Sequence, residues 1–247
     1  MYLFIKKTIT KIIPRKFLFE HEEKFRKIYS LLYSGSNFSC SVCAKKLNQF
    51  ISTENHDSIC PACGSLKRNR RLWILLEQEF LFPNCAILDF SPSRSLFRKL
   101  KKRTDINYTS TDLSGDFIAE YQWDITNIPN NDNAFDLIIC YHILEHIVDD
   151  TLAMKELFRV LKPGGNVLVQ TPFKEGDIYE NDKIVSNEDR LIHFGQEDHV
   201  RVYSAIGLKK RLELCGFDVT IRHYLNEKNQ YDLADDETIL VLTKPVN

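Results

Sequence analysis

Short apolar runs alternate with amphipathic stretches from residue 85 onward. Six runs are rich in branched and aromatic side chains and predict β-strands, at Ala86–Phe90, Tyr108–Thr111, Phe135–Cys140, Asn166–Thr171, Asp218–Tyr224 and Glu237–Thr243. Three stretches with helical periodicity lie between them, at Ser95–Lys102, Thr151–Leu161 and Ala205–Cys215. This alternation predicts an α/β fold in which helices cover both faces of a doubly wound, mostly parallel sheet.

Residues that start and stop helices support these boundaries. Asp149 and Asp150 are candidate N-caps of the second helix, which Pro163-Gly164-Gly165 would end, and Gly216 would close the third helix. Residues 172–202, in contrast, are polar and show little periodicity. A stretch of this length inside a compact domain is often a lid or a substrate loop, and we expect one here.

Residues 1–35 alternate basic and large apolar side chains. The simplest interpretation is a helical arm. The alternative is an amphipathic segment that contacts an anionic membrane, because five basic residues cluster there: Lys6, Lys7, Lys11, Arg15 and Lys16. No apolar stretch approaches the roughly 20 residues that cross a bilayer, and no signal peptide is recognisable. We expect a cytoplasmic protein. Contact of the arm with the inner face of the membrane is an open alternative.

The length and net charge of the chain limit its domain organisation and its classes of partner. A chain of 247 residues can form one main domain with a small module beside it. The formal net charge of −1 gives no overall attraction for polyanions, so nucleic acid is an improbable partner. The oligomeric state is not predicted.

Four cysteines form two CxxC pairs, Cys40 with Cys43 and Cys60 with Cys63, separated by sixteen residues. This spacing is typical of a tetrahedral four-thiolate zinc site, and Gly64 can take the positive φ that the second turn needs. Because four protein ligands leave no position for water, we expect a structural Zn²⁺ rather than a catalytic one.

The other three cysteines, Cys85, Cys140 and Cys215, stand alone in apolar surroundings and are interpreted as core residues. The basic run Lys67–Arg71 opens an apolar helix and is interpreted as a solvated face, with phosphate binding as the alternative. The predicted organisation is an N-terminal helical arm over residues 1–35, a zinc-ribbon module over 36–68 and a catalytic domain over 69–247.

Ligands of an open parallel sheet bind beyond the carboxyl ends of its strands. After the first strand, Asp89 is followed by Ser91, Ser93 and Ser95, which stand where an acidic-x-Gly-x-Gly-x-Gly nucleotide loop has its glycines. Serine permits a fairly close backbone approach but tolerates positive φ less well than glycine. We therefore expect the loop to differ somewhat from the glycine form.

Two further carboxylates follow at places where a nucleoside could bind. Asp112, 23 residues beyond Asp89, is followed by Leu113 and can accept both ribose hydroxyls of an adenosine. Asp124, followed by Ile125, offers a carboxylate for an adenine amino group beside apolar walls.

The strand Phe135–Cys140 continues into Tyr141-His142-Ile143-Leu144-Glu145-His146-Ile147 and, after a helix, Leu161-Lys162-Pro163-Gly164-Gly165. Together these segments resemble the class I S-adenosylmethionine-dependent methyltransferases, in the branch marked by FDxI, LEHI and LKPGG, over residues from about 85 to 245. The resemblance implies a seven-stranded Rossmann-like sheet and S-adenosylmethionine as cofactor.

The same resemblance assigns roles to residues. It implies that Asp89 and the loop from Ser91 to Ser95 lie near the methionine portion, Asp112 and Leu113 near the ribose, and Asp124 and Ile125 near the adenine. Tyr141 joins this cofactor-binding set.

The segment Gly195-Gln196-Glu197-Asp198-His199-Val200-Arg201-Val202-Tyr203 is similar to the GQxDHVRxY of bacterial methyltransferases that carry a zinc ribbon and look tied to surface-polysaccharide biosynthesis. We therefore expect a small-molecule or glycan acceptor, methylated on a hydroxyl. His199 and His142 are candidate general bases, and Arg201 is a candidate for binding an acidic sugar or a phosphate.

Three other interpretations stay open at this point. One is a ribosomal RNA methyltransferase, in which a cysteine-rich module also precedes the catalytic domain. Another is a scaffold that has lost its cofactor with its glycines. The third is an inverted zinc protease, since His142, Glu145 and His146 match HxxEH, although His142 directly follows a strand and the match is interpreted as accidental.

Overall fold

A computed structural model describes residues 15–53, 57–225 and 229–246, with side chains from His21 onward. The chain forms two compact units. Unit 1 comprises residues 1–74 and 228–234, and unit 2 comprises residues 75–227 and 235–247. Of the basic residues in the predicted arm, Lys6, Lys7 and Lys11 lie outside the described part.

Unit 1 is built from short elements. They are α2 (Arg15–Tyr29), the 3-10 helix η1 (Ser30–Tyr33), β1 (Ser34–Ser39), β2 (Lys46–Leu47), β3 (Ile51–Ser52), β4 (Ser58–Ile59) and most of α3 (Lys67–Leu75). Strands β1 and β2 form one antiparallel pair, and β3 and β4 form another. Within the described residues none of the helices, in either unit, combines the length and apolarity needed to span a bilayer.

Arg70 lies at the centre of unit 1 and its side chain is 0% exposed. Its guanidinium donates hydrogen bonds to the carbonyl oxygens of Ser58, Ser65, Tyr231 and Asp232, and also to the Asp232 carboxylate at 3.2 Å. Tyr231 and Asp232 are thus tied into unit 1 although they lie far along the chain. The expectation of a solvated basic face is wrong for Arg70, because two local and two distant carbonyl oxygens supply the partners that let a charge be buried.

Unit 2 contains the α/β sheet. Its elements are η2 (Leu76–Phe80), β5 (Ala86–Phe90), α4 (Arg94–Lys101), β6 (Asn107–Thr111), β7 (Phe135–Tyr141), η3 (Leu144–His146), α5 (Asp150–Val160), β8 (Leu161–Gln170), β9 (Tyr179–Glu180), α6 (Asn187–Phe194), β10 (Arg201–Val202), α7 (Ala205–Glu213), β11 (Asp218–Leu225) and β12 (Asp236–Thr243). The sheet order is β11-β12-β8-β7-β5-β6. Strands β6, β5, β7 and β8 are parallel, whereas β12 is antiparallel to both of its neighbours.

All six predicted strands and three predicted helices are present, most with ends within one or two residues. Asp149 is the N-cap that accepts a hydrogen bond from the backbone of Leu152 at 2.9 Å. The Pro163-Gly164-Gly165 stop is misplaced, because α5 ends at Val160 and this tripeptide lies inside β8.

The prediction of a seventh strand is wrong for the described residues, which give the sheet six. Between β6 and β7 only Tyr121 forms an isolated parallel bridge, to Thr111 at the edge of the sheet. The residues around Tyr121 lack the run of alternating apolar side chains that would hold a longer strand against the core.

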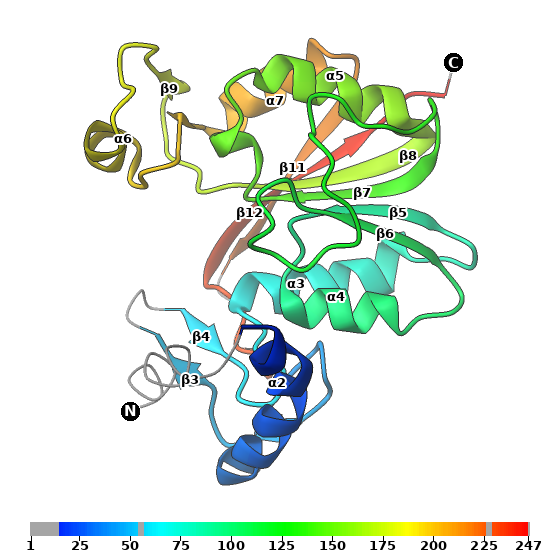
Figure 1. Ribbon diagram of the computed structural model, residues 1–247, viewed down its shortest axis with the longest axis vertical. Coiled ribbons are helices and arrows are strands. Elements are labelled where there is room, and N and C mark those ends of the chain that lie inside the picture. Colours follow the sequence, from blue (N-terminus) through cyan, green and yellow to red (C-terminus); the bar gives the residue numbers. More distant parts are fainter. Residues whose placement is uncertain (1–14, 54–56, 226–228, 247) are drawn as a thin grey trace. The chain divides into compact units, whose positions relative to one another are not determined.

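Helices cover both faces of this sheet, with α5 and α7 on one side and α4 on the other (Figure 1). The core packs Met154 and Leu157 of α5 and Leu208 of α7 against strand residues such as Ile138 and Val167. Cys85 and Cys140 are fully buried, as predicted, and Cys215 is half-buried.

The segment from 172 to 202 contains more structure than the predicted loop. It follows the carboxyl end of β8 and holds α6 and the antiparallel pair β9 and β10. Figure 1 shows α6 and β9 standing off the sheet. Ser186 caps α6 by accepting from the backbone of Asp189, and Gly195 ends the helix with a φ of 87°.

Candidate functional site

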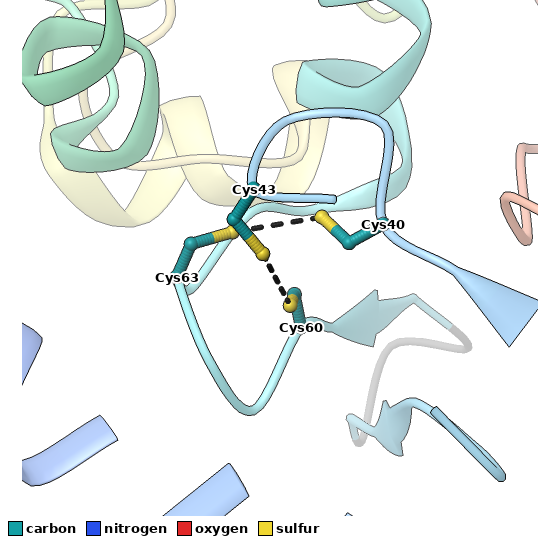
Figure 2. Close-up of side chains that lie close together, drawn as sticks. All are labelled: Cys40, Cys43, Cys60 and Cys63. Atoms are coloured by element: carbon teal, nitrogen blue, oxygen red, sulfur yellow. Dashed lines mark hydrogen bonds between the residues drawn. The ribbon is translucent and has the colours of Figure 1, made fainter. Parts of the chain in front are cut away.

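The four cysteines of the CxxC pairs converge in unit 1 (Figure 2). Cys40 Sγ lies 3.6 Å from Cys63 Sγ, and Cys43 Sγ lies 3.8 Å from Cys60 Sγ. A disulfide would need about 2.05 Å between sulfurs. Four thiolates at about 2.3 Å from a zinc ion instead form a tetrahedron with edges of about 3.8 Å. The sulfur positions therefore fit a four-thiolate zinc ion.

Both CxxC turns have the same backbone. The N–H of Ala44 donates to Cys40 O at 2.8 Å, and the N–H of Gly64 donates to Cys60 O at 2.9 Å. Gly64 has the predicted positive φ, at 81°, and Ala44 takes the equivalent place at 58°. Hydrogen bonds with neighbouring thiols lower the pKa of Cys40 and raise that of Cys43.

The serine loop after β5 keeps one feature of the glycine form. Ser91 has a φ of 45°, a left-handed conformation that glycine adopts readily and serine rarely does. Two contacts hold it there: its N–H donates to Thr111 O at 2.7 Å and its hydroxyl donates to Asp112 Oδ1 at 2.6 Å. Ser93 instead has ordinary φ and caps α4, and its hydroxyl lies 3.3 Å from that of the buried Ser95.

Asp89 lies inside the sheet and is 2% exposed. Burial raises the pKa of its carboxyl to about 7, although a hydrogen bond from the Tyr108 hydroxyl, 2.9 Å away, works in the other direction. Asp89 is therefore half protonated near neutral pH, and a nearby ammonium group would favour its ionised form.

Asp112 begins the loop after β6 and is 4% exposed. Oδ1 accepts the hydrogen bond of Ser91, and Oδ2 accepts one from the Ser114 hydroxyl at 2.8 Å and one from the N–H of Phe117 at 3.2 Å. A carboxylate has about four lone-pair sites, so one is left for a ligand hydroxyl. Leu113, the next residue, is 58% exposed.

Of the two residues predicted to lie near the adenine, Asp124 is on the surface and Ile125 is in the core. Asp124 is exposed, and its Oδ1 accepts from the N–H and the hydroxyl of Thr126, both at 2.8 Å. Ile125 is part of the core. The nearby rings of Tyr121 and Trp123 stack with centroids 4.7 Å apart and offer an aromatic surface that the sequence analysis did not single out.

The chain after β7 carries the next predicted residues. Tyr141 ends β7 and is half-buried. His142 has a φ of 57°, and its N–H donates to Gln170 O at 2.7 Å. His142 Nδ1 lies 3.4 Å from Glu145 Oε1, whereas its Nε2 is buried without a hydrogen-bond partner.

His199 is 4% exposed and packs edge-on against His146, with ring centroids 4.7 Å apart. Burial lowers the pKa of His199, and the neighbouring His146 lowers it further. The imidazole is therefore neutral at neutral pH. Its Nε2 is buried and has no hydrogen-bond partner.

Arg201 fastens the two motif segments together instead of facing a ligand. It is 6% exposed, and its guanidinium donates to the carbonyl oxygens of Leu144, Ile147 and Val148 and to the Glu180 carboxylate. The expectation that Arg201 binds an acidic sugar or a phosphate is not supported, because each guanidinium nitrogen already donates to the protein. Its role is to hold the chain around Glu145.

The structure thus brings Ser91 to Asp112 and His199 to His146. Glu145 is 1% exposed, and neither of its oxygens accepts a hydrogen bond. Its place in the site was missed, although the HxxEH spacing contained the signal. The buried oxygens Gln170 Oε1 and Thr171 Oγ1 at the end of β8 are likewise without hydrogen-bond partners, and nothing in the sequence marked them.

Solved structures share the fold of unit 2. YcgJ from Bacillus subtilis superposes with a TM-score of 0.50 at 14% identity, covering 72% of this chain and 100% of YcgJ. Haemonchus contortus phosphoethanolamine N-methyltransferase 2, solved with S-adenosylhomocysteine, gives 0.50 at 16% identity, covering 72% of this chain and 53% of that one. Unit 2 therefore has the Rossmann-like fold of these proteins.

Sequence comparison identifies the family. The methyltransferase domain family matches residues 65–221. A ubiquinone biosynthesis O-methyltransferase from Coxiella burnetii is 26% identical over 183 residues, covering 66% of this chain and 78% of the relative. A probable S-adenosylmethionine-dependent methyltransferase from Mycolicibacterium smegmatis is 30% identical over 95 residues, covering 38% and 33%. The chain belongs to the methyltransferase domain family and is an S-adenosylmethionine-dependent methyltransferase.

Proposed function

We propose that the protein transfers a methyl group to a hydroxyl oxygen of a sugar or of a lipid-linked glycan precursor. The observation that carries the proposal is a group of buried atoms without hydrogen-bond partners, on His142 and Glu145 after β7 and on His199 before β10, which suits the activation of a hydroxyl. The similar Coxiella protein is by its name an O-methyltransferase. The glycan part rests on the similarity of residues 195–203 to the polysaccharide-associated methyltransferases.

Residues at the ends of β5 and β6 would hold the cofactor. Ser91 supplies the left-handed turn, the loop through Ser95 leads into α4, and Asp112 keeps lone-pair capacity for a ribose hydroxyl. When bound, S-adenosylmethionine supplies an electrophilic methyl group on a sulfonium. The protein aligns the acceptor oxygen with the methyl carbon and holds water away from it.

The acceptor would lie beside residues 186–198. An open hollow of about 570 Å³ is lined there by Asn187, Arg190 and Asp198 among others, and Asp198 Oδ2 lies 3.1 Å from His146 Nδ1. Its polar lining suits a carbohydrate better than an apolar quinone ring. The Nε of Arg190 is buried without a partner and could receive an acidic substituent.

A structural zinc ion in unit 1 belongs to the same proposal. Four thiolates close the coordination of the metal, so its contribution is to folding. Elemental analysis of the isolated protein should find at least one zinc per chain, and the Cys40→Ser, Cys63→Ser double variant should contain one zinc fewer.

Calorimetric titration with S-adenosylhomocysteine tests the cofactor site. We expect saturable binding that weakens about tenfold or more in Asp112→Asn, because an amide offers fewer acceptor sites and no charge. Asp218→Asn is the matched control, because Asp218 is exposed at the start of β11 on the opposite edge of the sheet. Absence of binding in the wild-type protein would leave a scaffold in place of an enzyme.

Transfer of labelled methyl groups identifies the acceptor. Purified protein and labelled S-adenosylmethionine are incubated with a surface-polysaccharide and lipid-linked glycan fraction and, separately, with ribosomal RNA. Label in the glycan fraction that is released by ether-cleaving but not by ester-cleaving conditions is the expected result. Label in the RNA alone would replace the glycan proposal with ribosomal RNA methylation.

A further inference from the structure

Glu145, His146 and His199 form a second cluster of potential metal ligands, in unit 2. One atom from each lies within 4.8 Å of the other two. Glu145 and His146 belong to η3, and His199 precedes β10. The N–H of Val200 donates to Glu145 O at 2.9 Å, and Arg201 binds the carbonyl oxygens on either side. The cluster is therefore held by its backbone and not by bonds among its ligand atoms.

The ligand atoms of this cluster lack hydrogen-bond donors. Both oxygens of Glu145 are buried without a hydrogen bond, and so is His199 Nε2. A buried carboxylate without a donor costs free energy that folding must supply elsewhere. His142 Nδ1 lies 3.4 Å from Glu145 Oε1 and offers a charge contact without the geometry of a hydrogen bond, so both oxygens still lack a hydrogen-bond partner. A cation would satisfy all of these lone pairs at once.

One of the two histidines is oriented from behind, as metal-binding histidines usually are. His146 Nδ1 lies 3.1 Å from Asp198 Oδ2, and the buried ring of His199 packs edge-on against His146 while its Nε2 has no hydrogen-bond partner. An outer partner such as Asp198 fixes the tautomer and turns the other ring nitrogen toward the metal. This arrangement is not that of an inverted zinc protease, because His142 takes a left-handed turn after β7 and Glu145 and His146 lie in one turn of 3-10 helix.

We propose that Glu145, His146 and His199 bind one divalent transition-metal cation, such as Zn²⁺ or Mn²⁺. Two imidazoles and one carboxylate suit these ions and leave open coordination positions. The site follows β7 at the same edge of the sheet as the cofactor loops after β5 and β6. His199 is then a ligand and not the general base, a role that remains with His142.

This inference rests on the proposed O-methylation. It specifies the class of methyl acceptor, which is a molecule whose hydroxyl can coordinate a metal ion. Coordination lowers the pKa of the hydroxyl, whose proton passes to His142 or to water. The oxygen then forms a bond to the methyl carbon while the carbon–sulfur bond breaks and its electron pair stays on sulfur. The products are a methyl ether, S-adenosylhomocysteine and the released proton.

Metal content of the full-length protein tests the site. Protein that keeps its cysteine-bound zinc is equilibrated with Mn²⁺ or with Zn²⁺, passed through a desalting column and analysed for metals. We expect one added ion per chain in the wild-type protein and in His223→Gln, whose histidine is exposed on β11. Glu145→Gln and His199→Gln should each lose most of the added ion, and without added metal they should unfold at nearly the same temperature as the wild-type protein. An equal content in the variants, or no added ion of either metal, would overturn the proposal.

Cofactor binding separates this proposal from the proposed function. The same variants should bind S-adenosylhomocysteine as the wild type does, and should lose methyl transfer at least tenfold. Methyl transfer that survives in both variants would refute the metal site and leave the methyltransferase intact. If the wild-type protein takes up the added ion but methylates no hydroxyl, the proposed function is refuted and the proposed metal site stands.

Discussion

Arg70 and Glu145 are both buried charged side chains, one in each unit, and they differ in what surrounds them. Four carbonyl oxygens and a carboxylate accept hydrogen bonds from Arg70, whereas neither oxygen of Glu145 accepts one and only His142 Nδ1, at 3.4 Å, lies near. A buried charge with its full set of partners is part of the architecture. Glu145 has no hydrogen-bond donor, and its position at the carboxyl edge of the sheet favours a ligand that would supply the missing partner.

Arg70→Met should have the largest effect on stability. The substitution leaves four carbonyl oxygens and Asp232 without their donor, and removing one partner of a buried charged network costs about 3–5 kcal/mol. Trp73 lies in unit 1 and Trp123 in unit 2, so fluorescence in a Trp123→Phe background reports unfolding of unit 1 in urea. The control is Lys46→Met, an exposed position in β2, which should change stability by less than about 0.5 kcal/mol. Equal effects would show that the Arg70 network is not structural.

Asp89 is intermediate between Arg70 and Glu145, because its buried carboxyl has one hydrogen-bond donor, the Tyr108 hydroxyl. Its pKa is raised from 3.8 to about 7 by burial, so the folded protein binds this proton more tightly than the unfolded chain does. The resulting stability is complete below about pH 4 and is lost as the pH rises to about 7. Relative to Asp89→Asn, the cofactor-free wild-type protein should lose about 2 kcal/mol between pH 5 and pH 7.

Urea unfolding of both proteins at pH 5, 6, 7 and 8 measures this difference. Any pH dependence of the zinc module is common to the two proteins and cancels. A stability difference that stays constant with pH would mean that Asp89 titrates in its ordinary range. Adding S-adenosylhomocysteine should then raise the wild-type stability most at pH 8, because its ammonium group favours the ionised carboxylate.

Local patterns in the sequence predicted local structure well. The two CxxC pairs place four sulfurs by the geometry of two short turns, and periodicity located six strands. Contacts between distant segments left no such pattern. Two partners of Arg70, Tyr231 and Asp232, lie about 160 residues away. His199 lies beside His146 where Val200 and Arg201 bind the carbonyl oxygens around η3. The seventh strand is an error of the other kind, because it was predicted and is not formed. The prediction came from resemblance to a family, and residues 112–133 do not form that strand.

Glu145→Gln should have the smallest effect, less than about 1 kcal/mol in protein without added metal, because the carboxylate makes no hydrogen bond that the amide would lose. Burial raises the pKa of Glu145, but His142 and His146 outweigh it, so removing the charge trades a burial cost for a lost attraction. The matched contrast is Asp150→Asn, at a buried carboxylate that binds Tyr203 and Arg211 and should cost about 3 kcal/mol. Urea unfolding followed by circular dichroism compares the stabilities of the two variants.

With Mn²⁺ at 100 times its Kd, the wild-type protein should gain about 2.7 kcal/mol of stability and Glu145→Gln should gain none. A Glu145→Gln loss as large as that of Asp150→Asn without metal would make Glu145 a structural residue like Arg70.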